Sequence, residues 1–194
     1  MKAITLHGAG DVRVESVPDP RVIDPTDAVV RITTSAVCGS DLHQYHGRVA
    51  GLEPGVVMGH EFMGVVEEVG AQVTQVRRGD RVIAPFSISC GTCAWCRMRL
   101  PTQCVTTGRA VFGGRFGLQY PGGQAEAIRV PFADFMCEKA PAGMKDEEVF
   151  FLGVRRWRPR LHRPLRVLSL VGWAAVALLL QLSLLRSWEI LQVG

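Results

Sequence analysis

Four closely spaced cysteines constrain this chain more than any other feature of its sequence. They follow the pattern C-x2-C-x2-C-x7-C, at Cys90, Cys93, Cys96 and Cys104. Four thiolates this close can surround one tetrahedral Zn²⁺ at about 2.3 Å per Zn–S bond. A complete shell of four protein ligands leaves no position open for a substrate, so we expect this zinc to be structural.

Two alternatives to zinc exist for these cysteines, a disulfide pair and a redox-active C-x-x-C motif. A disulfide needs an oxidising compartment. The N-terminal residues 1–8 contain no apolar run that could act as a signal peptide, so a cytoplasmic location is the default expectation. A redox C-x-x-C needs a thioredoxin-like βαβ setting, which the surrounding sequence does not provide. The pattern therefore favours a zinc lobe.

The first 153 residues are rich in short β-type segments separated by glycine and proline. No helix longer than about two turns is expected before residue 140, and Met144–Phe150 can begin a short one. Many short strands with frequent turns predict a mostly β fold, a small barrel or sandwich. The expected strands are Ala3–Leu6, Val12–Val17, Ala28–Val37, Phe62–Val69, Arg81–Ala84 and Ala125–Val130.

The composition changes abruptly after Gly153. Residues 1–153 carry 15 Lys and Arg against 17 Asp and Glu, whereas residues 154–194 carry 7 Arg and no Lys against the single Glu189. Leucine rises from 6 in the first segment to 11 in the second. We therefore divide the chain into a domain at 1–153 and an atypical Arg/Leu-rich tail at 154–194. The positive charge belongs to the tail, so it does not indicate nucleic-acid binding by the main domain.

A second group of potential metal ligands lies upstream of the cysteine lobe. Cys38 precedes Asp41 closely, and His60 and Glu61 follow about twenty residues later. Taken singly, each is weak: a lone cysteine is usually a small buried apolar residue, and a lone His-Glu pair usually lies on the surface. Together they offer a thiolate, an imidazole and a carboxylate, which suit a catalytic zinc that keeps one position for substrate.

The spacing Gly59-His60-Glu61-x2-Gly64-x5-Gly70-x2-Val73 resembles the signature of the zinc-dependent medium-chain alcohol dehydrogenase family. The cysteine lobe follows at the family's distance, and Gly79-Asp80-Arg81-Val82 matches another family turn. The resemblance covers residues 1–153 and implies the family's GroES-like small β-barrel, which forms its catalytic domain. The segment 122–126 is similar to the branch that includes the glutathione-independent formaldehyde dehydrogenases.

The resemblance also implies a role for each residue of the second group. Cys38 and His60 would bind the catalytic zinc, with Glu61 as a near or intermittent ligand. Asp41 would orient His60, as histidine ligands usually require. The family further commonly has an aspartate ligand where this chain has Val154, which cannot bind a metal.

Two more residues would handle protons. Ser40 would take the proton of a zinc-bound alcohol, and His43 would pass it towards solvent. The zinc would polarise a small alcohol or aldehyde, NAD(P) would exchange the hydride, and the family often forms homo- or hetero-oligomers. His46 has no assignable role and is expected in a solvated loop, while Cys137 is expected in the core.

A nucleotide-binding domain is not recognisable in the sequence. A Rossmann domain needs on the order of 150 residues and a G-x-G-x-x-G turn, but only the 41 residues of the tail follow Gly153. We assign no cofactor-binding residues. The chain is therefore expected to be the zinc-binding catalytic portion of an alcohol dehydrogenase, cut off before its Rossmann domain and inactive alone.

The tail admits two readings. Its composition suggests a reading-frame slip, a retained intron or an alternative exon. Alternatively, the uncharged stretch 167–185 could form one hydrophobic helix that spans roughly 28 Å and anchors the chain in a membrane. Arginines upstream of that stretch would then keep the zinc domain in the cytosol. The corresponding alternative functions are a non-catalytic, membrane-tethered zinc module and a product without function.

Overall fold

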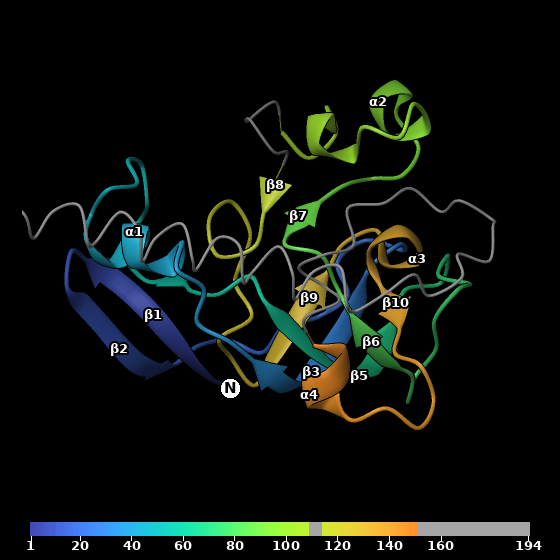
Figure 1. Ribbon diagram of the computed structural model, residues 1–194, viewed down its shortest axis with the longest axis horizontal. Coiled ribbons are helices and arrows are strands. Elements are labelled where there is room, and N and C mark those ends of the chain that lie inside the picture. The colour runs from blue at the N-terminus through green and yellow to red at the C-terminus, as the bar shows by residue number, and fades with distance from the viewer. Residues whose placement is uncertain (109–113, 151–194) are drawn as a thin grey trace, which may run out of the picture. The chain divides into compact units, whose positions relative to one another are not determined.

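Short strands dominate the computed structural model, which describes residues 1–108 and 114–150 (Figure 1). The mostly β fold expected from the sequence is confirmed, and each of the six expected strands is present. The strands are β1 (Lys2–Gly8), β2 (Asp11–Ser16), β3 (Ala28–Ser35), β4 (Val56–Val57), β5 (Phe62–Val69), β6 (Arg81–Ile83), β7 (Ser87–Ile88), β8 (Gly114–Arg115), β9 (Ala127–Val130) and β10 (Glu138–Lys139).

The helices in the described part of the chain are all short, as expected. They are α1 (Asp41–Tyr45), α2 (Ala94–Arg97), α3 (Ala133–Met136) and α4 (Asp146–Val149), with a 3-10 turn at Pro101–Gln103. The predicted helix start near Met144 is confirmed by α4. A salt bridge between Arg81 and Asp146 ties α4 to β6, and the Thr33 hydroxyl donates to the same carboxylate.

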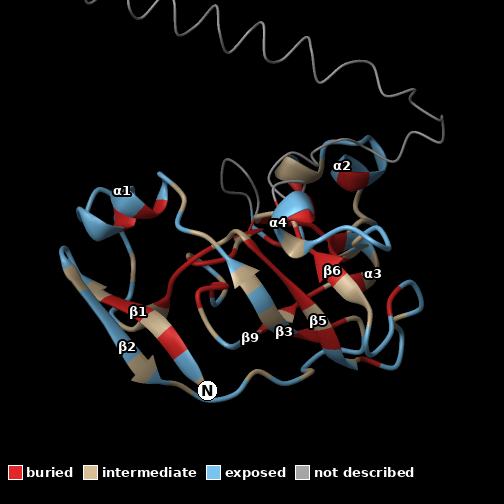
Figure 2. Cartoon of the chain, turned by 60° about the horizontal axis from the view of Figure 1, so that its bottom comes forward, coloured by how far each residue is buried: buried red, intermediate tan, exposed pale blue. Residues whose placement is uncertain are grey.

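The strands form a five-stranded sheet in the order β10-β6-β5-β3-β9, a three-stranded sheet β2-β1-β4 and the small pair β7-β8. The long pairing of β3 with β5 forms the centre of the larger sheet, and two register irregularities bend it. Ala28, Val30 and Ile32 alternate along β3 and pack into the core, where Val66 of β5 joins them. Figure 2 shows buried residues gathered along these central strands. The core cluster contains Val30 of β3, Val66 of β5 and Ile128 of the neighbouring strand β9.

The segment before β9 connects the two larger sheets. Ala125 bridges to Ala3 of β1, and the Glu126 amide donates to the Lys2 carbonyl at 3.0 Å. On its other side, the Glu126 carbonyl accepts from the Ile32 amide of β3 at 2.9 Å. One short segment therefore satisfies backbone groups of both β1 and β3, and this fixes the position of the neighbouring residues 122–124.

Some expectations lie outside the described residues. They include the hydrophobic helix at 167–185 and the metal-ligand position at Val154. Within residues 1–108 and 114–150, no helix is long and apolar enough to cross a membrane.

Candidate metal centres

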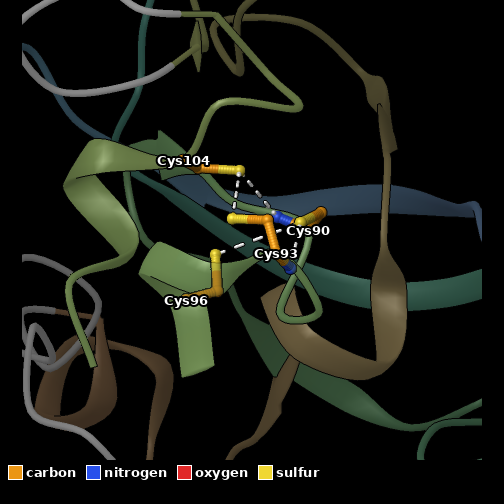
Figure 3. Close-up of side chains that lie close together, drawn as sticks. All are labelled: Cys90, Cys93, Cys96 and Cys104. Carbon is orange, nitrogen blue, oxygen red and sulfur yellow. Dashed lines mark hydrogen bonds between the residues drawn. The ribbon is translucent and has the colours of Figure 1, made fainter. Parts of the chain in front are cut away.

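The four lobe cysteines converge on one point (Figure 3). Their ligand atoms all lie within 4.8 Å of one another, and the Sγ atoms of Cys90 and Cys96 are 4.0 Å apart, as are those of Cys93 and Cys104. A tetrahedral zinc with bonds of about 2.3 Å would separate its sulfurs by about 3.8 Å. The observed spacing therefore fits one shared Zn²⁺.

Local hydrogen bonds prepare one of these thiols to lose its proton. The backbone amides of Thr92 and Cys93 donate to Cys90 Sγ at 3.5 and 3.3 Å. Burial opposes ionisation of this thiol, but hydrogen bonds from Thr106 and Thr92 outweigh it and lower the pKa of Cys90 to about 5. Burial instead raises the pKa of Cys96, which also faces the Cys93 thiol. Four thiolates cannot share this space without a cation to balance their charge, and a metal supplies it.

The alternative of a disulfide does not fit this geometry. A disulfide bond is about 2.05 Å long, far shorter than the 4.0 Å between the paired sulfurs, and all six cysteines of the chain are free thiols. Cys137 lies apart from both clusters, buried in the main core, where burial raises the pKa of its thiol to about 12.

The second cluster forms where β3 ends and β5 begins. Ser35 pairs with Phe62 in the antiparallel register, so the residues just beyond these two strand ends meet. Ligand atoms of Cys38, His60 and Glu61 lie within 4.8 Å of one another, and all three side chains are half-buried. The structure thus brings the three expected ligands together, and their number leaves a fourth position available.

Asp41 links the two strand ends that carry these ligands. Its Oδ2 accepts a hydrogen bond from the Cys38 amide at 2.9 Å, and its Oδ1 lies 3.1 Å from His60 Nδ1. A proton held on Nδ1 by this carboxylate leaves Nε2 free to bind a metal. Burial lowers the pKa of His60, but the interactions of its imidazole with the Asp41 carboxylate and the Cys38 thiol together outweigh burial and raise the pKa overall. Asp41 therefore lies where it can orient His60.

The two expected proton-transfer residues differ in their surroundings. Ser40 Oγ lies 3.2 Å from His60 Nε2, next to the cluster. His43 is exposed on α1, and its backbone amide donates to the Ser40 carbonyl at 3.1 Å. Its imidazole forms no contact with the cluster in the described part of the chain. His46 is also exposed, and its ring packs edge-on against Tyr45, as a solvated loop residue can.

Sequence reasoning missed two residues beside the second cluster. Phe86 packs edge-on against His60, with ring centroids 6.1 Å apart. Gln124 donates from Nε2 to Asp41 Oδ2 at 3.1 Å, across 83 positions of sequence. The signal for Gln124 was the preceding glycine pair: a Cβ on Gly122 would come within 2.1 Å of the Met58 carbonyl oxygen, which only close backbone packing produces.

A β-based fold with a four-cysteine lobe and a separate Cys-His-Glu cluster defines the class of zinc-binding dehydrogenase catalytic domains. The chain belongs to the alcohol dehydrogenase GroES-like domain family, which matches residues 24–142. This confirms the family resemblance found in the sequence.

Similar proteins support the same conclusion. The chain is 44% identical over 154 residues to an uncharacterized zinc-type alcohol dehydrogenase-like protein, AdhB, of Bacillus subtilis, covering 76% of this chain and 41% of that protein. It is 36% identical to a glutathione-independent formaldehyde dehydrogenase of Pseudomonas aeruginosa, covering 72% and 37%. Among solved structures, it matches the alcohol dehydrogenase TADH from Thermus sp. ATN1 with a TM-score of 0.71 and 39% identity, covering 79% and 44%. The chain thus spans about two fifths of each relative.

Proposed function

We propose that residues 1–153 form the zinc-binding catalytic portion of an oxidoreductase that acts on small alcohols or aldehydes. The observation that supports this most is the presence of two unlike ligand sets in one domain. The lobe offers four thiols with no open position, whereas Cys38, His60 and Glu61 offer three ligands beside a serine hydroxyl. The first set suits a structural zinc, and the second suits a catalytic zinc.

The proposed chemistry divides between the metal and the chain. Zinc bound by Cys38, His60 and Glu61 would act as a Lewis acid towards an alcohol or carbonyl oxygen. Ser40 Oγ lies 3.2 Å from His60 Nε2, so its hydroxyl can accept the proton of an alcohol held there. His43 is exposed one helical turn further on and can release that proton to water. Asp41 keeps the His60 imidazole in the required tautomer.

The proposal includes the rest of the reaction. NAD(P), bound to a nucleotide-binding domain, would exchange the hydride with the substrate. We also propose that the protein forms oligomers and is located in the cytosol. Similarity to a protein named as a formaldehyde dehydrogenase supports short-chain alcohols or aldehydes as the substrates of this chain. The rival function, a zinc module without catalysis, predicts a filled lobe but no metal at the second cluster, so metal stoichiometry separates the two.

Graded chelation tests this proposal directly. Zinc-loaded protein should contain two Zn²⁺, and a chelator titration should remove the metal in two steps, first from Cys38, His60 and Glu61 and then from the lobe. The first site offers fewer thiolates and one open position, and thiolates are strong ligands for zinc. A single step that removes both metals together would contradict the assignment, and a content of one Zn²⁺ would favour the rival function.

Replacement of Asp41 by asparagine should weaken the second site selectively. The amide cannot accept at both of its terminal atoms, so either the Cys38 amide or His60 Nδ1 loses its acceptor. Loss of such a supporting group typically costs about 10–100-fold in metal affinity. Competition with a chromophoric chelator would measure this loss. An unchanged affinity in Asp41→Asn would mean that the carboxylate does not position the ligands.

A further inference from the structure

Gln124 lies at a point where it can control the second metal cluster without touching the metal. It is 8% exposed, and its amide Nε2 donates both to Asp41 Oδ2 at 3.1 Å and to the Ala36 carbonyl at 3.2 Å. Both partners are acceptors, so the nitrogen of the amide must face them. We propose that Gln124 is a positioning residue for the catalytic metal site, acting through Asp41. This inference rests on the proposed function.

The Asp41 carboxylate, which Gln124 contacts, is buried and has few hydrogen-bond donors around it. Asp41 is 2% exposed, so water cannot replace a missing donor easily. Its Oδ2 has two donors, the Cys38 amide and Gln124, while Oδ1 faces His60 Nδ1. Without the Gln124 donor, only the Cys38 amide holds Oδ2, and the carboxylate can rotate away from His60. The imidazole would then lose the contact that fixes its tautomer.

The backbone around Gln124 is fixed against the backbone that leads into His60. The amides of Gly122, Gly123 and Gln124 donate to the carbonyls of Val57, Gly59 and Met58, respectively, each at 2.9 Å. This pairing holds the Gln124 side chain at a set distance from the residue before His60. Because the backbone is already fixed, only the side-chain rotamers of Gln124 remain to be ordered when its amide bonds to Asp41.

Gly59 shows how closely these two backbones approach. Its φ is +92°, and a Cβ there would lie 2.8 Å from the Gln124 backbone nitrogen and 2.5 Å from Gln124 Cγ. Only glycine fits this left-handed conformation and this contact. The glycine of the Gly59-His60-Glu61 motif thus makes room for Gln124, which connects the metal-ligand motif to the segment at 122–124.

The test compares two buried glutamines. Gln124→Met removes the amide but keeps the length of the side chain. Gln44→Met is the matched control, because Gln44 is also buried, at 5% exposure, and its side-chain oxygen has no hydrogen-bond partner in the described part of the chain. Each variant is loaded with Zn²⁺ and then with Co²⁺ at the second site. The measurements are Co²⁺ affinity by competition and the visible spectrum of the bound Co²⁺, which reports ligand geometry.

We expect Gln124→Met to weaken Co²⁺ binding at the second site about tenfold and to alter its spectrum, with the lobe zinc retained. Gln44→Met should change neither. An unchanged affinity and spectrum in Gln124→Met, or an equal change in both variants, would overturn the inference while leaving the proposed function intact. A wild-type chain that binds metal only at the lobe would overturn the proposed function itself. Should Gln124→Met fail to fold, Gln124→Asn, whose amide is one methylene too short to reach Asp41, is judged by the same criteria.

Discussion

A Cys93→Ser variant is expected to lose the tightly bound lobe zinc and a large part of the domain's stability. Cys93 Sγ lies 4.0 Å from Cys104 Sγ and within 4.8 Å of every other ligand atom of the lobe. A serine hydroxyl is a much weaker zinc ligand than a thiolate. The remaining thiols pack closely around the vacated position, and their mutual repulsion opposes ionisation without the metal.

The expected loss of unfolding free energy is on the order of 3–5 kcal/mol, which is large against the total stability of a typical domain. It should stay below the apparent zinc-binding free energy of about 10–16 kcal/mol seen in zinc-finger peptides, because this chain has a separate apolar core around β3 and β5. Metal analysis after exhaustive dialysis measures the zinc content, and urea unfolding of the zinc-loaded protein measures the free energy of unfolding.

Cys137→Ser is the matched control for this experiment. It makes the same chemical change at a buried cysteine that belongs to the main core and to neither cluster. It should lower stability through packing but keep the full zinc content. The lobe assignment fails if Cys93→Ser retains as much tightly bound zinc as the wild type or as Cys137→Ser.

The parts of the fold that the sequence predicted are those with a local signal. β5 was predicted with its observed bounds because Phe62–Val69 combines β-branched residues with a glycine that ends the run. β4, β7, β8 and β10 were missed because each contains two residues, too few for any periodicity. Their existence depends on neighbouring strands rather than on their own residues.

The two metal clusters also differ in how far local sequence predicts them. The lobe ligands lie close in sequence, so their spacing alone predicts a shared metal. The Cys38 and His60 ligands meet because β3 and β5 pair with Ser35 opposite Phe62, and that register comes from the tertiary fold. Gln124 could not be found from either motif, because it reaches Asp41 through the bridge from β1 to the segment before β9. The more a contact depends on strand pairing, the less the sequence predicted it.

Assayed by itself, the 194-residue chain is expected not to oxidise alcohols with NAD or NADP. In the proposed chemistry, Ser40 would move a proton and the metal would polarise a substrate, but none of these groups would accept a hydride. The nicotinamide must be held within about 3.5 Å of the substrate carbon, and correct placement alone is worth about 7–11 kcal/mol of the barrier. Proton-handling residues therefore cannot compensate for an unplaced cofactor.

Placing the cofactor takes a surface that binds its pyrophosphate and ribose. The sequence 154–194 contains no glycine-rich turn, and its only acidic residue is Glu189, so neither group has a recognisable partner there. The measurement is NADH or NADPH production by zinc-loaded protein, with short alcohols and formaldehyde, against buffer and against a Cys38→Ala control. The expected rate equals that of buffer in both proteins. Turnover that disappears in Cys38→Ala would show that the chain carries a nucleotide site of its own. Activity in excess of that of a full-length relative assayed alone, and absent with Cys38→Ala, would instead place that site on the partner, with the Cys38 cluster supplying the zinc half of the reaction.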